Sequence, residues 1–364
     1  MKDFHADLLV DPTDSTGFAA PELAANGDGL LTNASNGNQY PVRAGVAVFV
    51  NGALPKQPSP GSVDAAQANP VAGNAMPGAG DWSFSREWDE HFDTGNERTW
   101  GYTVQERFEQ LLMECQVSED DLRTMTILDA GCGNGSLTNL VARKCATVVG
   151  IDFSSSVHGA NRQGKETGAQ FVQGDLLAPP LAAGSFDLIF SIGVLHHTPD
   201  TRRAFDAVAK LVKPGGKMYV WLYRRPENFL GRCVKVPIYD GLRWVISRLS
   251  AKGQDRAVGA YARLVHGLHS LRRGGAPVPL REYVISAYDD LACRWRYYHH
   301  PIEVARWFHE NGFSAPTLSH WDNPYGFGVV ATRVPAAATP GISYGDGVKL
   351  WDPDQTLLGR LHKD

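Results

Sequence analysis

Apolar runs that end in polar or glycine-rich turns recur through the middle of the chain. Five runs, ending near residues 129, 151, 173, 192 and 221, predict buried strands, and helical patterns lie between them. A further run over 325–332 is broken by glycines and predicts a last strand, preceded by a helix that ends at a glycine near residue 312. The pattern therefore predicts an α/β domain built on a mostly parallel sheet.

The turn after the first strand carries the strongest local signal. The strand ends in Asp129, glycines follow at 131, 133 and 135, and a helical pattern starts near Ser136. Glycines let the backbone approach a ligand closely because no Cβ stands in the way. A strand, a tight turn and a helix predict a nucleoside-sized ligand at the carboxyl edge of the sheet.

Acidic residues follow the next two strands. Asp152 comes directly after the second strand, where a carboxylate can accept hydrogen bonds from two ribose hydroxyls. Asp175 follows the third strand, where it can hold an adenine amino group. A nicotinamide enzyme is the alternative, but its G-x-G-x-x-G pattern fits the turn imperfectly, since Ser136 follows Gly133-Asn-Gly.

In this order the motifs resemble those of the class I S-adenosylmethionine-dependent methyltransferases, and the resemblance covers about 82–332. It implies a Rossmann-like seven-stranded sheet with a helical insertion after the fifth strand. It also implies S-adenosylmethionine as cofactor, S-adenosylhomocysteine as product, and no metal. The residues expected at the cofactor are Asp129, Gly131, Cys132, Gly133, Asp152, Phe153, Gly174, Asp175, Leu176 and Ser191.

A dense aromatic and polar stretch precedes the first strand. In the family this stretch often folds over the cofactor as a lid, which makes Trp100, Tyr102 and Arg107 candidates for cofactor contact. Ordinary packing of a helix on the sheet is the alternative for each of them.

Two histidines follow the fourth strand. Methyl transfer from a sulfonium is an in-line displacement, and an acceptor that bears a proton must lose it to a base. His196 occupies the position that is similar to the catalytic histidine of plant-type O-methyltransferases, and His197 is the second candidate. A pair that only orders the loop is the alternative.

The stretch 224–300 is expected to be a helical insertion on the acceptor side. Between 229 and 275 the apolar positions have helical spacing, and arginines and lysines accompany them. Such an insertion can cover the acceptor, meet a membrane surface or an anionic substrate, or stand in solvent as a hairpin.

The end of this insertion is rich in aromatic and polar residues. It resembles a segment that faces the active-site mouth in a bacterial subgroup of the family, while core packing explains its tyrosines as well. An arginine here would favour a carboxylate or phosphate on the substrate. The acceptor-binding candidates are Tyr288, Asp289, Arg294, Tyr298, His299 and His300.

The first 51 residues predict a small β-rich segment whose outline is similar to a zinc ribbon found in front of many bacterial methyltransferases. Asp11, Asp14 and Asn33 stand where that ribbon carries cysteines, so no structural zinc is expected. The segment is expected to pack on the catalytic domain or on a second subunit, or to be an inert cap. A linker over 52–81, the methyltransferase domain over 82–335 and a tail over 336–364 complete the expected organisation.

Composition narrows the class of protein. The chain of 364 residues carries a formal charge of −4, which argues against a general binder of DNA or RNA. Its five cysteines form no C-x-x-C pair, and neither a signal peptide nor an apolar stretch of membrane-spanning length is visible. We expect a cytoplasmic protein without a transmembrane segment, with peripheral membrane contact and a homodimer as open expectations.

The leading hypothesis is a methyltransferase that acts on O, N or S of a small, anionic or amphiphilic acceptor. An RNA or protein methyltransferase is the alternative, suggested by the ribbon-like segment. A third hypothesis is a regulator that binds the cofactor without turnover.

Overall fold

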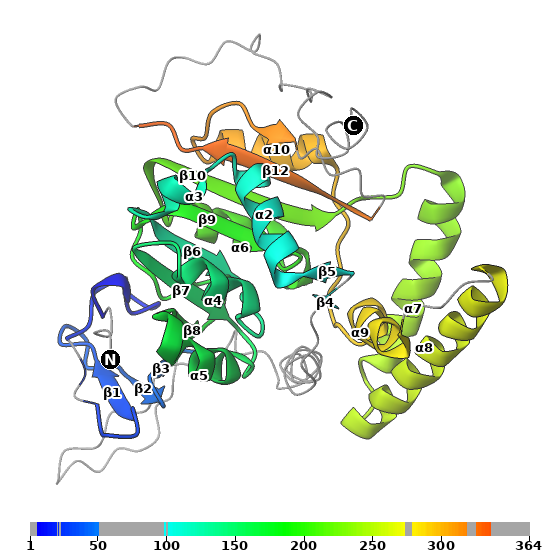
Figure 1. Cartoon of the computed structure of the whole chain (residues 1–364), viewed down its shortest axis with the longest axis horizontal. Coiled ribbons are helices and arrows are strands. Elements are labelled where there is room, and N and C mark those ends of the chain that lie inside the picture. Colours follow the sequence, from blue (N-terminus) through cyan, green and yellow to red (C-terminus); the bar gives the residue numbers. More distant parts are fainter. Residues whose placement is uncertain are drawn as a thin grey trace.

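A computed structural model describes residues 6–19, 21, 23–50, 98–99, 101–273, 279–318 and 325–335 (Figure 1). The expected linker, Trp100 and the C-terminal tail therefore lie outside the described residues. Within them, ten strands form one mixed sheet in the order β1-β2-β3-β8-β7-β6-β9-β10-β12-β11.

Seven of these strands make up the sheet that the sequence predicts. The carboxyl ends of β6, β7, β8 and β9 lie on one edge because these strands run parallel, whereas β12 is antiparallel to β10 and β11 is antiparallel to β12. The chain moves outward from β6 to β8 and then returns to the other side of β6, which creates a switch point between β6 and β9. The strands are β6 (Thr126–Ala130), β7 (Thr147–Asp152), β8 (Gln170–Gln173), β9 (Phe186–Ile192), β10 (Val212–Tyr223), β11 (Thr317–Leu318) and β12 (Gly326–Thr332).

Helices cover both faces of the sheet (Figure 1). Successive strand residues alternate between two apolar cores, as Ile127 and Leu128 of β6 do, because side chains along a strand point to opposite faces. One core packs under α2 (Val104–Cys115), α4 (Ser136–Ala142) and α5 (Val157–Thr167). The other packs under α6 (Thr201–Ala209) and α10 (Pro301–Glu310). The predicted α/β fold is thus confirmed.

The N-terminal segment enlarges the sheet. β3 pairs in parallel with β8, and β2 and β1 continue antiparallel, so the sheet has ten strands rather than seven. The additional elements are the short helix η1 (Ala6–Leu8), β1 (Gly29–Thr32), β2 (Gln39–Arg43) and β3 (Val46–Val48). Pairing with the parallel sheet was not visible in the sequence, because a three-residue strand carries too little pattern.

A hydrogen-bonded cluster stands where a ribbon would hold zinc. Asp11, fully buried, accepts side-chain bonds from Asn33 and Asn36 at 3.0 Å each and from Tyr40 at 2.9 Å. Asp14 also accepts from Asn36, at 2.6 Å. Asp11 and Asp14, like Asn33 and Asn36, have the spacing of a C-x-x-C pair. These carboxylates and amides form hydrogen bonds with one another where a zinc ribbon would bind its metal through thiolates.

The insertion after β10 forms a helical unit that projects beside the sheet (Figure 1). It contains the π-helix η4 (Gly231–Lys235), α7 (Val236–Ile246), α8 (Ala251–Arg273) and α9 (Leu280–Leu291). Val258 and Ala262 of α8 pack against Ala287 and Tyr288 of α9 in a small core of their own. The remaining elements are β4 (Arg98–Thr99), β5 (Tyr102–Thr103), α3 (Glu119–Leu122) and the short helix η3 (Leu195–His197).

Candidate functional site

The glycine-rich turn lies at the switch point of the sheet. Gly131 has a φ of +97° and Gly133 a φ of +52°, backbone conformations that residues other than glycine rarely adopt. A Cβ on Gly131 would lie 2.3 Å from a methyl carbon of Val194. The turn after β6 is therefore packed tightly against the loop after β9, and its backbone is bare.

Asp152 holds the same turn from the neighbouring strand. One oxygen of its carboxylate accepts from the Gly133 N–H at 2.9 Å, and the other accepts from the backbone and hydroxyl of Ser154 at 2.9 and 2.7 Å. Asp152 is partly exposed, but the protein around its carboxyl removes enough water to raise its pKa. A carboxylate has about four acceptor positions, so a ribose hydroxyl can be accepted beside the three existing donors.

Asp129 lies beneath the turn. Its buried carboxylate accepts from the Thr138 hydroxyl at 2.6 Å. Burial raises the pKa of Asp129 to about 7, while the bond from Thr138 and the charge of Arg107 on α2 oppose this shift. The Asp129 carboxyl therefore titrates near neutral pH, and its charge at that pH depends on neighbouring groups such as Thr138 and Arg107.

Asp175 occupies the next strand end. One of its carboxylate oxygens accepts from the Leu177 N–H at 2.9 Å, and burial raises its pKa. The Gly174 N–H donates to the Asp152 carbonyl at 2.9 Å, which ties the two acidic turns together. Leu176 is buried beside them.

The other cofactor candidates occupy the same region in different ways. The Ser191 hydroxyl donates to the Ala130 carbonyl at 2.7 Å, and the Phe153 carbonyl accepts from Gln173 at 3.1 Å. Cys132 is buried, which raises the pKa of its thiol well above the usual value. Tyr102 lies partly buried in β5.

These residues fit S-adenosylmethionine. Glycines at 131 and 133 leave the backbone of the turn without side chains, which suits the methionine portion, and partly exposed carboxylates at two successive strand ends suit the ribose and the adenine. Within the described residues, no group of three or more His, Cys, Asp or Glu side chains is arranged to hold a metal ion.

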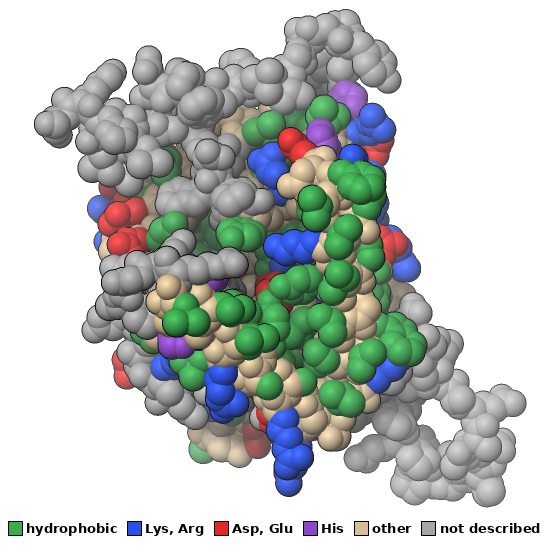
Figure 2. Space-filling model, turned by 90° about the vertical axis from the view of Figure 1, so that its right-hand side faces the viewer, with side chains coloured by type: hydrophobic (Ala, Val, Ile, Leu, Met, Phe, Trp, Pro, Cys, Tyr) green, Lys and Arg blue, Asp and Glu red, His purple; other side chains and the backbone are tan. Residues whose placement is uncertain are grey.

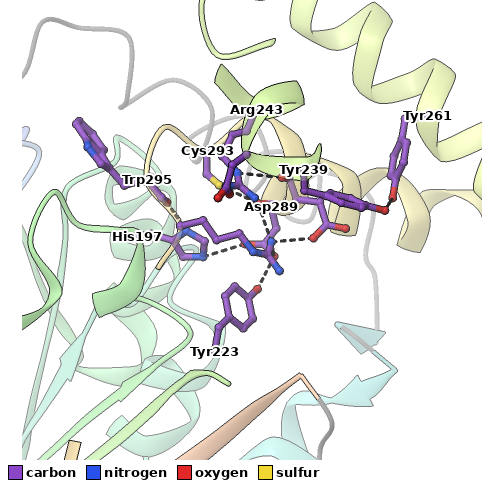
Figure 3. Close-up of polar contacts among 11 residues, drawn as sticks. His197, Tyr223, Tyr239, Arg243, Tyr261, Asp289, Cys293 and Trp295 are labelled. Atoms are coloured by element: carbon purple, nitrogen blue, oxygen red, sulfur yellow. Dashed lines mark hydrogen bonds and ion pairs between the residues drawn. The ribbon is translucent and has the colours of Figure 1, made fainter. Parts of the chain in front are cut away.

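A buried polar network lies just beyond β9 and β10 (Figure 3). Asp289 of α9 is its centre: one carboxylate oxygen lies 2.9 Å from Nε2 of His197, and the other accepts from the Tyr223 hydroxyl and from Arg296. His197 Nδ1 lies 3.0 Å from the Trp295 carbonyl. The insertion is thus bound to the strand ends through an ion pair and hydrogen bonds.

The charges in this network are fixed by their neighbours. Burial alone would lower the pKa of His197, but the Asp289 carboxylate raises it to about 10. Burial would raise the pKa of Asp289, but Arg296 and His197 hold it far below its usual range. At neutral pH the network therefore contains a protonated His197 and an ionised Asp289.

His196 is the opposite case. It is fully buried, and neither ring nitrogen has a hydrogen-bond partner among the described residues. Its ring lies 4.0 Å from the Tyr223 ring and 4.3 Å from the His197 ring, measured between centroids. Burial and then the charge of His197 lower the pKa of His196 well below the usual value, so the imidazole is neutral.

The structure brings only some of the acceptor-binding candidates together. Asp289 lies in the network, and the Tyr298 ring lies 6.2 Å from that of Tyr223. His299 is buried and bonds to β10 through its backbone, since its N–H donates to the Tyr223 carbonyl. Tyr288 donates to Asp255 inside the helical unit.

Arg294 and His300 lie at the surface. The Arg294 guanidinium stands over the Trp295 ring at 4.8 Å, and His300 caps the start of α10 by accepting from the Ile302 N–H. His300 also lines an open cavity of about 370 Å³, with Arg225, Pro226, Glu227 and Arg232. This cavity lies at the base of the insertion rather than at the glycine turn, so we do not assign it to the cofactor.

Sequence reasoning missed Tyr223 and Arg296. Tyr223 is the last residue of β10, and its place at the carboxyl end of a strand is the signal that could have found it. Arg296 is two residues from Arg294, and spacing alone could not choose between two arginines in an irregular segment. Arg296 contacts both Asp289 and Asp290, at 2.9 and 2.8 Å.

Comparisons with known proteins agree with this geometry. The family described as "Methyltransferase domain" matches residues 128–220, which include the glycine turn, both acidic turns and both histidines. Ubiquinone biosynthesis O-methyltransferases are among the curated relatives. The protein from Marinobacter nauticus is 34% identical over 110 residues, which are 28% of this chain and 46% of that protein. The protein from Bordetella avium is 36% identical over 114 residues, which are 30% of this chain and 47% of that protein.

The chain spans about half the length of these curated relatives. Among solved structures, magnesium protoporphyrin IX methyltransferase from Synechocystis with bound SAH aligns with 70% of this chain and 97% of its own, at 17% identity and a TM-score of 0.41. The family match and the sheet topology lead to one conclusion. Residues 128–220 belong to a class I methyltransferase domain, the S-adenosylmethionine-dependent type.

Proposed function

We propose that the chain is a cytoplasmic S-adenosylmethionine-dependent methyltransferase that methylates a hydroxyl of a small, anionic or amphiphilic acceptor. The observation that carries the proposal is the state of His196, a neutral, buried imidazole whose two nitrogens have no hydrogen-bond partner among the described residues. His196 also lies two residues from Val194, whose side chain packs on the glycine turn. None of the described helices is long and apolar enough to cross a membrane.

The binding half of the proposal rests on the strand ends. Asp152 would accept from the ribose and Asp175 from the adenine, while the bare backbone at Gly131 and Gly133 would lie against the methionine portion. When bound, S-adenosylmethionine supplies an electrophilic methyl group on a sulfonium. The chain's own task is then to align the acceptor, exclude water and accept a proton.

His196 is our candidate for that last task. Its pKa lies well below the usual value, so the imidazole is already deprotonated at neutral pH. The imidazole would accept the proton that the acceptor O–H gives up on methyl transfer. The Asp289 carboxylate beyond His197 opposes part of the lowering that burial and the His197 charge impose on the pKa of His196. A thioether acceptor would need no base, and the hydroxyl acceptor is favoured for this reason.

The names of the relatives support oxygen as the methylated atom, because they are called O-methyltransferases. The acceptor-binding roles of Tyr298, Asp289 and His299, the exclusion of RNA and the homodimer stay predictions. An RNA or protein acceptor remains the alternative.

The first experiment is calorimetric titration with S-adenosylmethionine and S-adenosylhomocysteine, followed by transfer of a labelled methyl group into a fractionated metabolite extract. Binding together with a labelled small molecule supports the proposal. Label found only in RNA or protein would favour the alternative, and absence of binding would contradict the assignment of Asp129 to Asp175.

His196→Gln tests the base. We expect turnover to fall about 10²- to 10⁴-fold, the usual contribution of a positioned base, with cofactor affinity unchanged. His309→Gln is the matched control, because His309 is an exposed histidine on α10. Loss of cofactor affinity in His196→Gln would assign the residue a structural role instead.

A further inference from the structure

The outer surface of the helical unit is apolar to an unusual degree. Of the sixteen large hydrophobic side chains that are exposed among the described residues, eleven lie between 229 and 271. Monomeric proteins rarely leave such a concentration open unless it meets something. The eleven are Phe229, Leu230, Val234, Ile238, Leu242, Trp244, Val245, Leu249, Leu264, Leu268 and Leu271.

Most of these side chains form two stripes. Along η4 and α7 they recur every three or four residues, at positions 234, 238, 242 and 245, so they share one side of the helix; Leu230 and Leu249 stand just before and just after it. On α8, Leu264, Leu268 and Leu271 repeat the pattern, and Leu271 is 85% exposed. Figure 2, which shows the side of the molecule that carries this unit, displays hydrophobic side chains in continuous rows with blue basic side chains at their edges.

The stripes are not part of the unit's own core. That core is formed by Val258 and Ala262 of α8 against α9, on other positions of the same helix. A helix with two apolar sides is expected to pack against a partner on each side. Among the described residues, α8 has a partner for the side that carries Val258 and Ala262, but not for the side that carries Leu264 and Leu268.

Charge distinguishes this surface from the rest of the chain. Between 229 and 271 there are seven arginines and lysines and two aspartates, in a protein whose formal charge is −4. One aspartate, Asp240, is paired with Arg243 at 2.6 Å, and the other, Asp255, accepts from Tyr288. The exposed basic side chains are Arg232, Lys235, Arg248, Lys252, Arg256 and Arg263.

The basic side chains flank the stripes. The Arg248 guanidinium stands over the Trp244 ring at 4.1 Å, and the Lys235 ammonium lies 5.8 Å from the centre of the Tyr239 ring. An aromatic ring beside a cation suits the boundary between hydrocarbon and charged headgroups, where the ring is buried and the charge stays in water.

Charge also selects among the occupants of this surface. A second copy of the chain would meet it with the same surface, which would place basic side chains against basic side chains. An anionic lipid surface supplies hydrocarbon for the stripes and negative charge for their edges. We propose that η4, α7 and α8 dock the protein onto an anionic membrane surface, with their apolar stripes in the headgroup region.

The docking surface and the buried network belong to one helical unit. α7 of the surface carries Arg243, whose Nε donates to the Asp290 carbonyl of α9 at 3.1 Å. Asp289, next in the chain, is the centre of the network. The proposed docking surface and the buried network are therefore linked through the contact of α7 with α9.

Co-sedimentation with lipid vesicles tests this inference. The full chain is mixed with vesicles of phosphatidylcholine alone or of phosphatidylcholine with phosphatidylglycerol. We expect sedimentation with the anionic vesicles only, and a bound fraction that falls as salt rises. Arg256→Glu with Arg263→Glu should weaken binding about fivefold or more per charge. Arg143→Glu, at the exposed end of α4 and outside the insertion, should not change it.

Leu242→Asp with Leu268→Asp tests the stripes. We expect at least a tenfold loss of vesicle binding, because each aspartate would have to enter the apolar boundary. Ile302→Asp is the matched control, since Ile302 is 60% exposed on α10 and lies outside the stripes. The arginine variants leave the stripes intact, so they test the inference even if the leucine variants do not fold.

Three results would overturn the inference: no binding to anionic vesicles, equal weakening by the control variants, or a dimer that Leu242→Asp dissociates while vesicles do not bind. Calorimetry with S-adenosylmethionine on the same samples separates the two proposals. Cofactor binding without vesicle binding overturns the docking surface alone, and vesicle binding without cofactor binding overturns the proposed enzyme alone.

Discussion

His196 and His197 are adjacent in the chain and carry the same side chain, yet their surroundings move their pKa values in opposite directions. Asp289 lies against His197 and holds it protonated, whereas His196 is enclosed by rings and stays neutral. The charge of His197 lowers the pKa of His196, so this imidazole is deprotonated at neutral pH but is also a weaker base than a histidine in water.

The pH dependence of stability follows from His197. Its pKa is about 6.5 in an unfolded chain and about 10 in the folded protein, so its ion pair stabilises fully below pH 6.5. We expect this contribution to be lost as pH rises from 6.5 through 10. The measurement is the free energy of unfolding of wild type and His197→Gln between these pH values, and their difference should shrink. A constant difference would mean that His197 is not charged in the folded state.

Asp289→Asn tests the network from its centre. The change keeps the shape but leaves His197 and Arg296 without a charge partner, and such a loss costs about 3–5 kcal/mol in buried pairs. Chemical denaturation would measure this loss. Asp240→Asn is the control, because Asp240 is an exposed carboxylate that also pairs with an arginine. A similar small loss in both variants would show that burial adds nothing to the Asp289 interactions.

At the scale of elements, the strand ends were predictable and their partners were not. The β6 turn, Asp152 and Asp175 occupy the positions that the apolar runs indicated, because strand length and glycine spacing are local properties of the sequence. Arg296 and Tyr223 meet only through the tertiary fold, across more than seventy residues, and no local pattern encodes that meeting. The same holds for β3 and β8, whose pairing adds β3 to one end of the parallel part of the sheet.

The glycine turn gives a test of the cofactor site. Gly131→Ala should abolish S-adenosylmethionine binding in calorimetry, because its Cβ would meet Val194 and push apart the two loops of the site. Gly184→Ala is the matched control: Gly184 also has a positive φ, of +63°, but nothing lies within 4 Å of its Cβ. Equal loss of binding in Gly131→Ala and Gly184→Ala would mean that backbone strain at a positive φ, and not the clash with Val194, causes the loss.

The hydrogen-bonded cluster at Asp11 gives a test of the N-terminal unit. Asp11→Ala removes the acceptor shared by Asn33, Asn36 and Tyr40, so we expect a loss of about 2–3 kcal/mol from the unsatisfied donors. Hydrogen exchange at β1 and β2 should rise accordingly. Asp14→Ala, at the exposed side of the cluster, should have a smaller effect; equal effects would show that burial of Asp11 does not matter.

At the scale of the molecule, the N-terminal unit protects one edge of the sheet. Removal of residues 1–50 would expose the apolar edge strand β8, which is a template for pairing with another chain. We expect the truncated protein to self-associate, as measured by light scattering. A stable monomer with an unchanged melting temperature would mean that the edge needs no cover.

The parallel pairing of β3 with β8 also bears on how the protein acquires its structure. Val48 lies opposite Gln173, so the partners are 125 residues apart in a chain that is made from its N-terminus. The first fifty residues leave the ribosome with no template for β3. Their docking must await the interior strands, and since contacts between distant residues are slow to close, it should be a late step of folding.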